Sequence, residues 1–386
     1  MGILAAVFGL LLWPLHYAGW WPLYPAVQHP RILVFGFGSA FVFGFLGTAW
    51  PRFLGSSALS AAEVLLTAAG WLAAVLFYAR GSIPGGDVVA AAVAGWFLLV
   101  LGRRLFAEGR ELPPPGFALA FFAVGLSLAV LLAWSAGWAT RSVAWDQFLR
   151  LLAYQGFLLL PIFGVGSYLF ARFFAPQGGV PSGRPSSGGV PSGRPGKAEG
   201  RPGRRVRRGL VVWGCAGLVL VSFAIEAWLS PRAGNGLRLV AVGLWSALAL
   251  PGIWRVRAPG TRAWALRLGL GMAGLAFLLR AVWPSLLFAF EHLLFLGGFS
   301  LVILLTADRV VLGHCDDPAR VAPRSGMWRW IFWLVVLTAA TRATADLVPS
   351  TRVSHHIYAA LMLAVVLGLW LGMHAKRLRR RPPSSE

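Results

Sequence analysis

Long apolar stretches, each close to the length of a membrane-spanning helix, recur along the whole chain and are separated by shorter polar or glycine- and proline-rich connections. An apolar run of about 20 residues forms a helix that can cross the hydrocarbon core of a bilayer, which is about 30 Å thick. The pattern therefore predicts an all-α polytopic membrane bundle of about twelve transmembrane helices. The expected spans are residues 2–20, 31–50, 58–79, 87–106, 116–138, 147–173, 209–229, 236–254, 262–283, 285–308, 327–346 and 354–375.

One segment in the middle of the chain breaks this pattern. It is rich in Gly, Pro, Ser and Arg, and it contains the string GGVPSGRP twice, at 178–185 and 188–195. Such a composition cannot bury a core and is typical of a flexible tether. The sequence therefore predicts a first six-helix half at 1–174, a linker at 175–208, a second six-helix half at 209–376 and a basic tail at 377–386.

The composition agrees with a membrane protein and excludes two other classes. Of the 386 residues, 58% are hydrophobic and 12% are charged, whereas soluble domains have about 25% charged residues. So apolar a chain is neither an ordinary soluble globule nor a disordered protein. The two cysteines, Cys215 and Cys315, provide no disulfide framework. Residues 2–20 follow no basic segment and contain no small-residue cleavage site, so we expect them to be the first span rather than a signal peptide.

The net charge of +22 could indicate a nucleic-acid partner, but its distribution does not. The basic residues lie mainly in the short connections between apolar stretches, where they determine membrane orientation. Of the 35 Lys and Arg residues, 26 fall in the even-numbered connections and the C-terminal tail, and 9 fall elsewhere. The expected partner is thus the lipid bilayer and not nucleic acid, with both termini in the cytoplasm.

This topology places most histidines at the outer ends of the spans. Five of the seven are expected there, namely His16, His29, His292, His355 and His356. Ionisable side chains lie at the same level, and their cost inside a membrane favours a functional role. They are Arg31, Glu226, Arg280, Glu291, Arg342 and Asp346. Because imidazole binds haem iron and copper, the sequence predicts a polar cavity that opens to the outside and can hold such a cofactor.

A structural explanation exists for each of these histidines. A histidine at a helix end often only hydrogen-bonds a carbonyl, and this applies most to His16. His355 and His356 are adjacent, so their side chains point about 100° apart on a helix and at most one faces a shared site. The string GHCDD at 313–317 contains metal-ligand residue types, but it is expected at the other membrane face, where a helix end and a polar loop explain it.

Three sequence elements resemble the NnrS family of haem- and copper-containing membrane proteins. EHLLFLGGFSLVILLTADRVVLGHCDD at 291–317 is similar to a family signature in which a histidine opens a helix and Arg-x-x-Leu-Gly-His closes it. HPRILVFGFGSAFVFGFLGTAWPRFLG at 29–55 resembles a second motif, with Arg31 and Ile32 in place of the family's histidine and glutamate. GFLLLPIFGVGSYLFARFF at 156–174 is similar to a glycine-rich family element.

The resemblance implies bound haem, with copper as a second candidate, in a multi-pass protein of the bacterial inner membrane. It also implies a role in nitric oxide stress linked to denitrification, with nitric oxide and a respiratory electron donor as partners. His29 and His292 are then the expected metal ligands. The wider set of expected cofactor-binding residues is His29, His292, His355, His356, His16, Glu291 and Arg280. No nucleophile–base pair or phosphate loop is visible, so any turnover would belong to the metal.

Two other functions fit the same sequence. Six plus six spans joined by a basic linker is a layout shared with many transporters, although no matching pair of interrupted helices is evident in the two halves. A cofactor-free assembly partner of a respiratory complex is the other alternative, in which the histidines would have no shared role.

Overall fold

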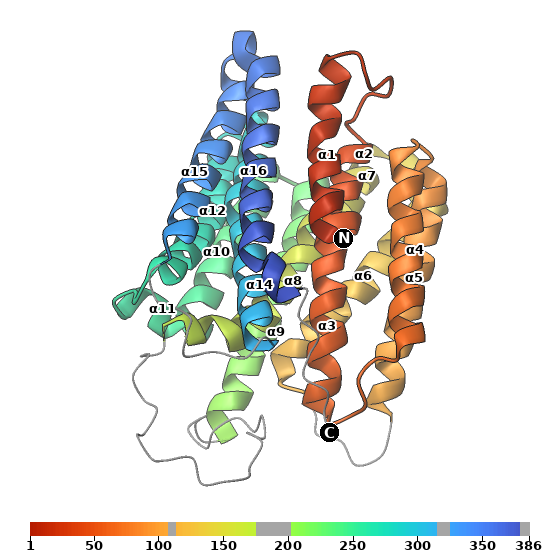
Figure 1. The fold of residues 1–386 in the computed structure, drawn as a ribbon. Helices are drawn as coiled ribbons and strands as arrows, with labels where there is room; N and C mark the ends of the chain where they lie inside the picture. Colours follow the sequence, from red (N-terminus) through yellow and green to blue (C-terminus); the bar gives the residue numbers. More distant parts are fainter. Residues whose placement is uncertain (107–112, 175–201, 315–324, 379–386) are drawn as a thin grey trace.

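The computed structural model describes residues 1–106, 113–174, 202–314 and 325–378, which form a bundle of helices without any strand (Figure 1). Each of the twelve predicted stretches coincides with a helix or with a continuous run of helical segments. The predicted all-α polytopic bundle is therefore confirmed. Residues 175–201 of the predicted linker and 379–386 of the tail lie outside the described part of the chain, and α9 begins at Pro202.

Most spans are single α-helices, and three are interrupted by a π-helical segment. The single helices are α1 (Gly2–Tyr17), α4 (Ala61–Ala79), α5 (Ile83–Leu105), α6 (Ala118–Ser135), α9 (Pro202–Trp228), α10 (Pro231–Ala249), α12 (Thr261–Val282), α15 (Gly326–Leu347) and α16 (Arg352–Leu378), with the short α11 (Pro251–Arg255) after α10. The interrupted spans are α2 (Gln28–Arg31) with α3 (Ser39–Leu54), α7 (Val143–Arg150) with α8 (Phe157–Leu169), and α13 (Leu287–His292) with α14 (Ser300–His314).

Ten helices within the described residues are long and apolar enough to cross a membrane, two fewer than the predicted twelve. Of the other two predicted spans, α1 has only 16 residues. The second, α10, carries Arg232, Asn235 and Arg238, which lower its mean hydropathy. The chain is thus a multi-pass membrane protein, and the orientation of its termini stays a prediction.

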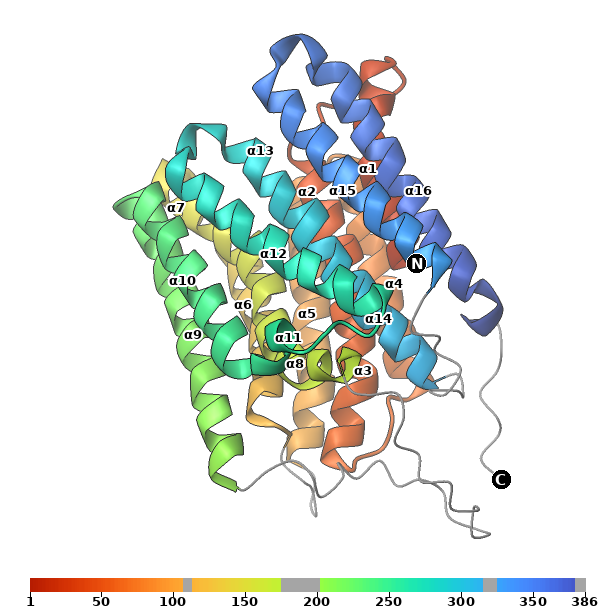
Figure 2. The same cartoon turned by 90° about the vertical axis from the view of Figure 1, so that its left-hand side faces the viewer.

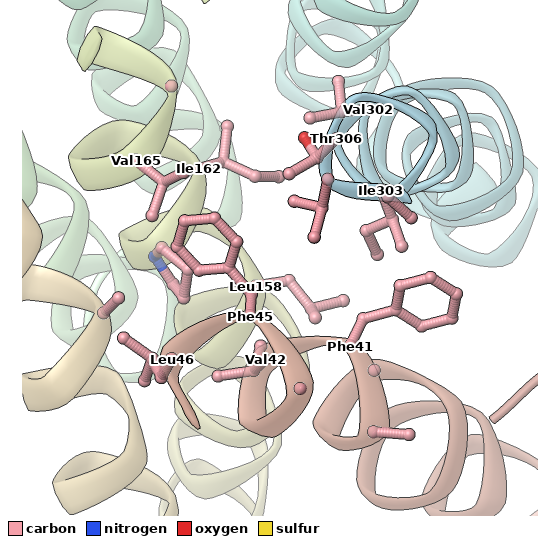
Figure 3. Close-up of a pocket in the computed structure, with 18 of the residues that line it drawn as sticks. Phe41, Val42, Phe45, Leu46, Leu158, Ile162, Val165, Val302, Ile303 and Thr306 are labelled. Atoms are coloured by element: carbon pink, nitrogen blue, oxygen red, sulfur yellow. The ribbon is translucent and has the colours of Figure 1, made fainter. Parts of the chain in front are cut away.

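The three π-helical segments occur at corresponding places in their spans. They cover Ile32–Gly38, Leu151–Gly156 and Leu293–Phe299, and each is followed directly by α3, α8 or α14. A π-helical turn is wider than an α-helical one and is frequent at functional sites. The α-helices that follow these segments line one common cavity (Figure 3). The three interrupted spans therefore form the centre of the bundle.

The other helices surround this centre in an order that repeats every four spans. The pairs α4–α5, α9–α10 and α15–α16 each pack as a hairpin, and Figure 2 shows α9 and α10 side by side at one edge. Between the hairpins, α5 packs on α6, α10 on α12, and α16 on α1. This order of contacts occurs three times along the chain, so the spans fall into three sets of four. The predicted division into two six-helix halves rests on the position of the linker and stays a prediction.

Buried indoles connect neighbouring spans through hydrogen bonds to main-chain carbonyls. Trp71 donates to the Gly36 carbonyl over 2.9 Å, Trp245 to Phe163 over 3.1 Å, and Trp370 to Leu304 over 3.1 Å. All three acceptors belong to the central spans. Because lipid offers no hydrogen-bond partner, a buried N–H group has to be satisfied within the protein. These tryptophans therefore fix the outer helices on the centre.

Two main-chain segments approach each other closely at Gly164 of α8 and Gly116. A Cβ atom added at Gly164 would lie 2.1 Å from the Gly116 carbonyl oxygen. We expect Gly164→Ala to lower the free energy of unfolding by about 1–3 kcal/mol, because backbone has to move to admit the methyl group. Thermal unfolding of the detergent-solubilised protein, followed by intrinsic fluorescence, measures this effect.

Gly125→Ala in α6 is the matched control, because an added Cβ there meets no atom within 4 Å. Its unfolding temperature should equal or exceed that of the wild type, since alanine favours helix over glycine. Equal unfolding temperatures for the two variants would show that the α8 contact is not tight.

Candidate cofactor site

His29 and His292 occupy similar places, just before the π-helical segments of their spans. Nδ1 of His29 donates a hydrogen bond to the Gly9 carbonyl of α1 over 2.9 Å. Nδ1 of His292 donates to the Phe288 carbonyl over 2.7 Å. Since a carbonyl can only accept, Nδ1 carries the proton in both rings. Each neutral ring therefore keeps a lone pair on Nε2 for a metal.

A third histidine, His356 of α16, lies in the same region. Its Nδ1 is 2.9 Å from the Tyr17 hydroxyl, and its buried Nε2 has no hydrogen-bond partner among the described residues. The Trp13 indole contacts both neighbouring imidazoles, at 5.4 Å from the His356 ring and 6.2 Å from the His29 ring. His29 and His356 therefore flank the same indole.

Three histidines lie in one region of the bundle. His29, His356 and the Arg342 guanidinium are near enough to the His292 ring to act on it electrostatically, although the three imidazoles are not close enough to hold one metal ion together. We call His29, His292 and His356 the histidine cluster. Its members come from three spans that are far apart in the sequence, namely those containing α2, α13 and α16.

The other two predicted histidines have different surroundings. His355 lies 2.9 Å from the Thr344 hydroxyl of α15, so the adjacent His355 and His356 face different helices, as their spacing predicts. His16 donates from Nδ1 to the Trp21 carbonyl over 3.1 Å, and its ring lies 5.5 Å from that of Tyr24. His16 thus has the helix-end contact that the structural explanation predicts, and a cofactor-binding role of His16 and His355 stays a prediction.

Arg280 and Glu291 belong to a buried network of charged and amide side chains. Arg280 pairs with Glu226 at 2.9 Å and lies 3.6 Å from Glu291, and Arg238 pairs with the other oxygen of Glu226. Gln155 connects Arg238 with Glu291, because its side-chain oxygen accepts a hydrogen bond from Arg238 over 2.6 Å and its amide donates one to Glu291 over 3.1 Å. Glu291 is adjacent to His292 in the chain, so the network fixes the start of that π-containing span.

Arg31, which replaces a histidine of the resembled motif, forms an ion pair and does not act as a metal ligand. Its guanidinium makes a bidentate contact with the Asp87 carboxylate, at 2.9 and 3.1 Å, and lies 4.4 Å from the centre of the Trp134 ring. The Tyr154 hydroxyl is 3.5 Å from its Nη1. An arginine bound in this way supports packing between spans and offers no metal ligand.

The number of side chains that could bind a metal together distinguishes between haem and copper. Within the described part of the chain, no three His, Cys, Asp or Glu side chains are close enough to hold a metal ion together. A copper site of the common protein type needs about three such ligands. Haem iron needs only one or two, because the porphyrin supplies the rest. A site with one or two histidine ligands, which is what His29 and His292 could supply, therefore suits haem better than copper.

Sequence reasoning missed three participants in this region. Trp13 and Tyr17 follow one another at helical spacing on α1, and Gln155 is an amide in an otherwise apolar run. A buried amide in a membrane helix is a detectable signal, whereas Trp13 and Tyr17 resemble ordinary interface aromatics. The side chain of His314 and all of Cys315 lie outside the described residues, so their predicted role at a helix end stays a prediction.

Comparison with known proteins agrees with the resemblance seen in the sequence. The family model described as NnrS protein matches residues 1–381, which is essentially the whole chain. A sequence search of curated proteins finds no significant match.

Removing the central carboxylate of the buried network should be strongly destabilising. We expect Glu226→Gln to lower the free energy of unfolding by about 3–5 kcal/mol, because Arg238 and Arg280 would lose their shared counter-ion away from water. Asp146→Asn is the control, since Asp146 pairs with an Arg150 side chain that is 59% exposed and should contribute less than about 1 kcal/mol. Equal unfolding temperatures for the two variants would contradict the role of the network.

Proposed function

This chain belongs to the NnrS family, and on that premise we propose that it is a haem-binding protein of the bacterial inner membrane that acts in the response to nitric oxide. We place the cofactor at the outer end of the bundle, with His29 and His292 as its ligands. The observation that carries the proposal is the hydrogen bond from each Nδ1 to a main-chain carbonyl.

This hydrogen bond is the usual support of a metal-binding imidazole. A metal-ligating histidine commonly donates its second ring N–H to a carbonyl or carboxylate, which fixes the tautomer, orients the ring and makes the other nitrogen a better ligand. Gly9 supplies the carbonyl for His29, and Phe288 supplies it for His292. Both rings are thereby prepared to bind through Nε2.

The surroundings of the cluster also suit a haem carrying two carboxylates. Arg342 lies within electrostatic range of all three histidines of the cluster. Its guanidinium pairs with Asp346 at 2.6 Å through Nη1, and its side chain is 12% exposed. A guanidinium has five N–H donors, so Arg342 has the capacity to bind a propionate as well.

Bound haem would supply the chemistry of nitric oxide binding or of electron transfer. The chain's own contribution is orientation and exclusion of water. His29 and His292 hold the cofactor, while Trp13 covers one side of the His29 ring. The contact between Tyr17 and His356 places a hydroxyl and an imidazole at the cluster, where they can hold a proton. Copper would require ligands beyond this set, so haem is the cofactor that we propose.

Replacing either proposed ligand should remove or shift the Soret band of the purified protein. We expect His292→Ala and His29→Ala each to reduce the haem content per chain severalfold, as measured by the optical spectrum and a pyridine haemochrome assay. Addition of nitric oxide to the reduced wild type should shift the band.

His374→Gln is the matched control. His374 lies near the opposite end of α16 and donates from Nε2 to Asp308 over 3.0 Å, a hydrogen bond that a glutamine amide can replace. Its spectrum should match that of the wild type. A wild-type protein with no Soret band, and no iron or copper by elemental analysis, would refute the proposal and favour a cofactor-free assembly partner.

A further inference from the structure

A cavity of about 300 Å³ lies between the three central helices α3, α8 and α14, below the π-helical segments. Figure 3 shows its walls, with Phe41 and Phe45 on one side and Ile162 and Ile303 on the others. The lining side chains are apolar except for the hydroxyl of Thr306 and the indole N–H of Trp370, which donates to the Leu304 carbonyl. The cavity is distinct from the histidine cluster, which does not contribute to its walls.

The cavity lies at the depth of the hydrocarbon core and is open at α3. Its walls are parts of the candidate spans Gln28–Leu54, Val143–Leu169 and Pro284–Leu312. Gly44 lines the cavity and is nonetheless exposed, and a Cβ added there meets no atom within 4 Å. Phe41 and Phe45, on either side of it, are half-buried. The cavity is therefore accessible from the bilayer along this face of α3.

The size and chemistry of the cavity identify the kind of molecule that fits. An apolar cavity of about 150 Å³ stays free of water and binds benzene, so twice that volume accommodates an alkyl chain of about a dozen carbon atoms. A void of this size forfeits dispersion contacts along its whole lining. A polar ring such as that of a quinone would find only the Thr306 hydroxyl, because the indole N–H of Trp370, the other polar group of the lining, already donates to the Leu304 carbonyl. In a bilayer, the available occupant of suitable chemistry is a lipid acyl chain.

A basic side chain lies where the headgroup of such a lipid would be. Arg52 is exposed and follows Phe45 by seven residues, so the two share one face of α3 about 10 Å apart along the helix axis. It belongs to the last turn of α3, at the predicted cytoplasmic surface. A cation there attracts anionic headgroups.

We propose that this cavity binds one acyl chain of an anionic phospholipid, with the lipid phosphate next to Arg52. The lipid fills the space between α3 and α14, whose spans carry His29 and His292 at their other ends. It therefore completes the packing at the centre of the bundle. This inference does not depend on the identity of the cofactor.

Native mass spectrometry of the full chain, delipidated in detergent and titrated with dioleoyl phosphatidylglycerol, tests this site. We expect one tightly bound lipid per wild-type chain. Gly44→Leu adds a side chain at the cavity wall, where a Cβ atom meets no other atom within 4 Å, and should weaken this binding about tenfold, because the lost space removes contacts with the acyl chain. Arg52→Gln should weaken binding of phosphatidylglycerol and leave that of phosphatidylcholine unchanged.

Gly217→Leu in α9 is the control, since it too enters open space but lies away from the cavity. It should bind lipid as the wild type does. Thr306→Phe fills the cavity from the opposite wall and replaces Gly44→Leu if that variant does not fold. Unchanged phosphatidylglycerol binding in the folded filling variant would overturn the proposal, as would displacement of the lipid by ubiquinone at equal concentration.

Discussion

The bilayer offers no hydrogen bonds to a buried polar group, and this constraint determines how the centre of the molecule is organised. Each charged or polar side chain in the spans has to find its partner on another part of the protein. Glu226 meets this requirement for two arginines at once, and Asp87 does so for Arg31. Asp308 similarly accepts from Arg262, Trp328 and His374. These pairs fix the register of helices whose apolar surfaces alone would allow them to slide.

The same constraint gives the histidine cluster its chemistry. Gly9 and Phe288 each satisfy one ring nitrogen of a histidine, and they leave the second nitrogen with a lone pair. The unpartnered Nε2 of His356 is an exception within a structure whose buried groups are otherwise mostly paired. A binding site requires such an unpaired group, because an imidazole whose two nitrogens are both hydrogen-bonded has no nitrogen left to bind a ligand. The apolar cavity below the cluster has no imidazole in its lining and suits a different kind of molecule.

Local patterns in the sequence were sufficient to predict the helices, since each depends on the apolar length of one stretch. They also predicted that the outer ends of the spans hold most of the histidines. They could not predict that His356 rather than His355 joins His29, because that choice depends on Tyr17 and Trp13 of a distant helix. The π-helical segments and the grouping of spans in fours were likewise not predicted. A wider helical turn preserves the apolar composition, and packing between spans leaves no periodic signal in a chain that is apolar on all sides.

We propose that a haem iron binds to Nε2 of His29 and His292. The most direct test is a crystal structure of the purified protein with anomalous diffraction recorded on both sides of the iron absorption edge. We expect an iron peak within bonding distance of at least one of these two Nε2 atoms, with the hydrogen bonds from Nδ1 to the main-chain carbonyls preserved. An iron peak next to other residues, or well-ordered imidazoles with no iron in a protein isolated from haem-replete cells, would contradict it.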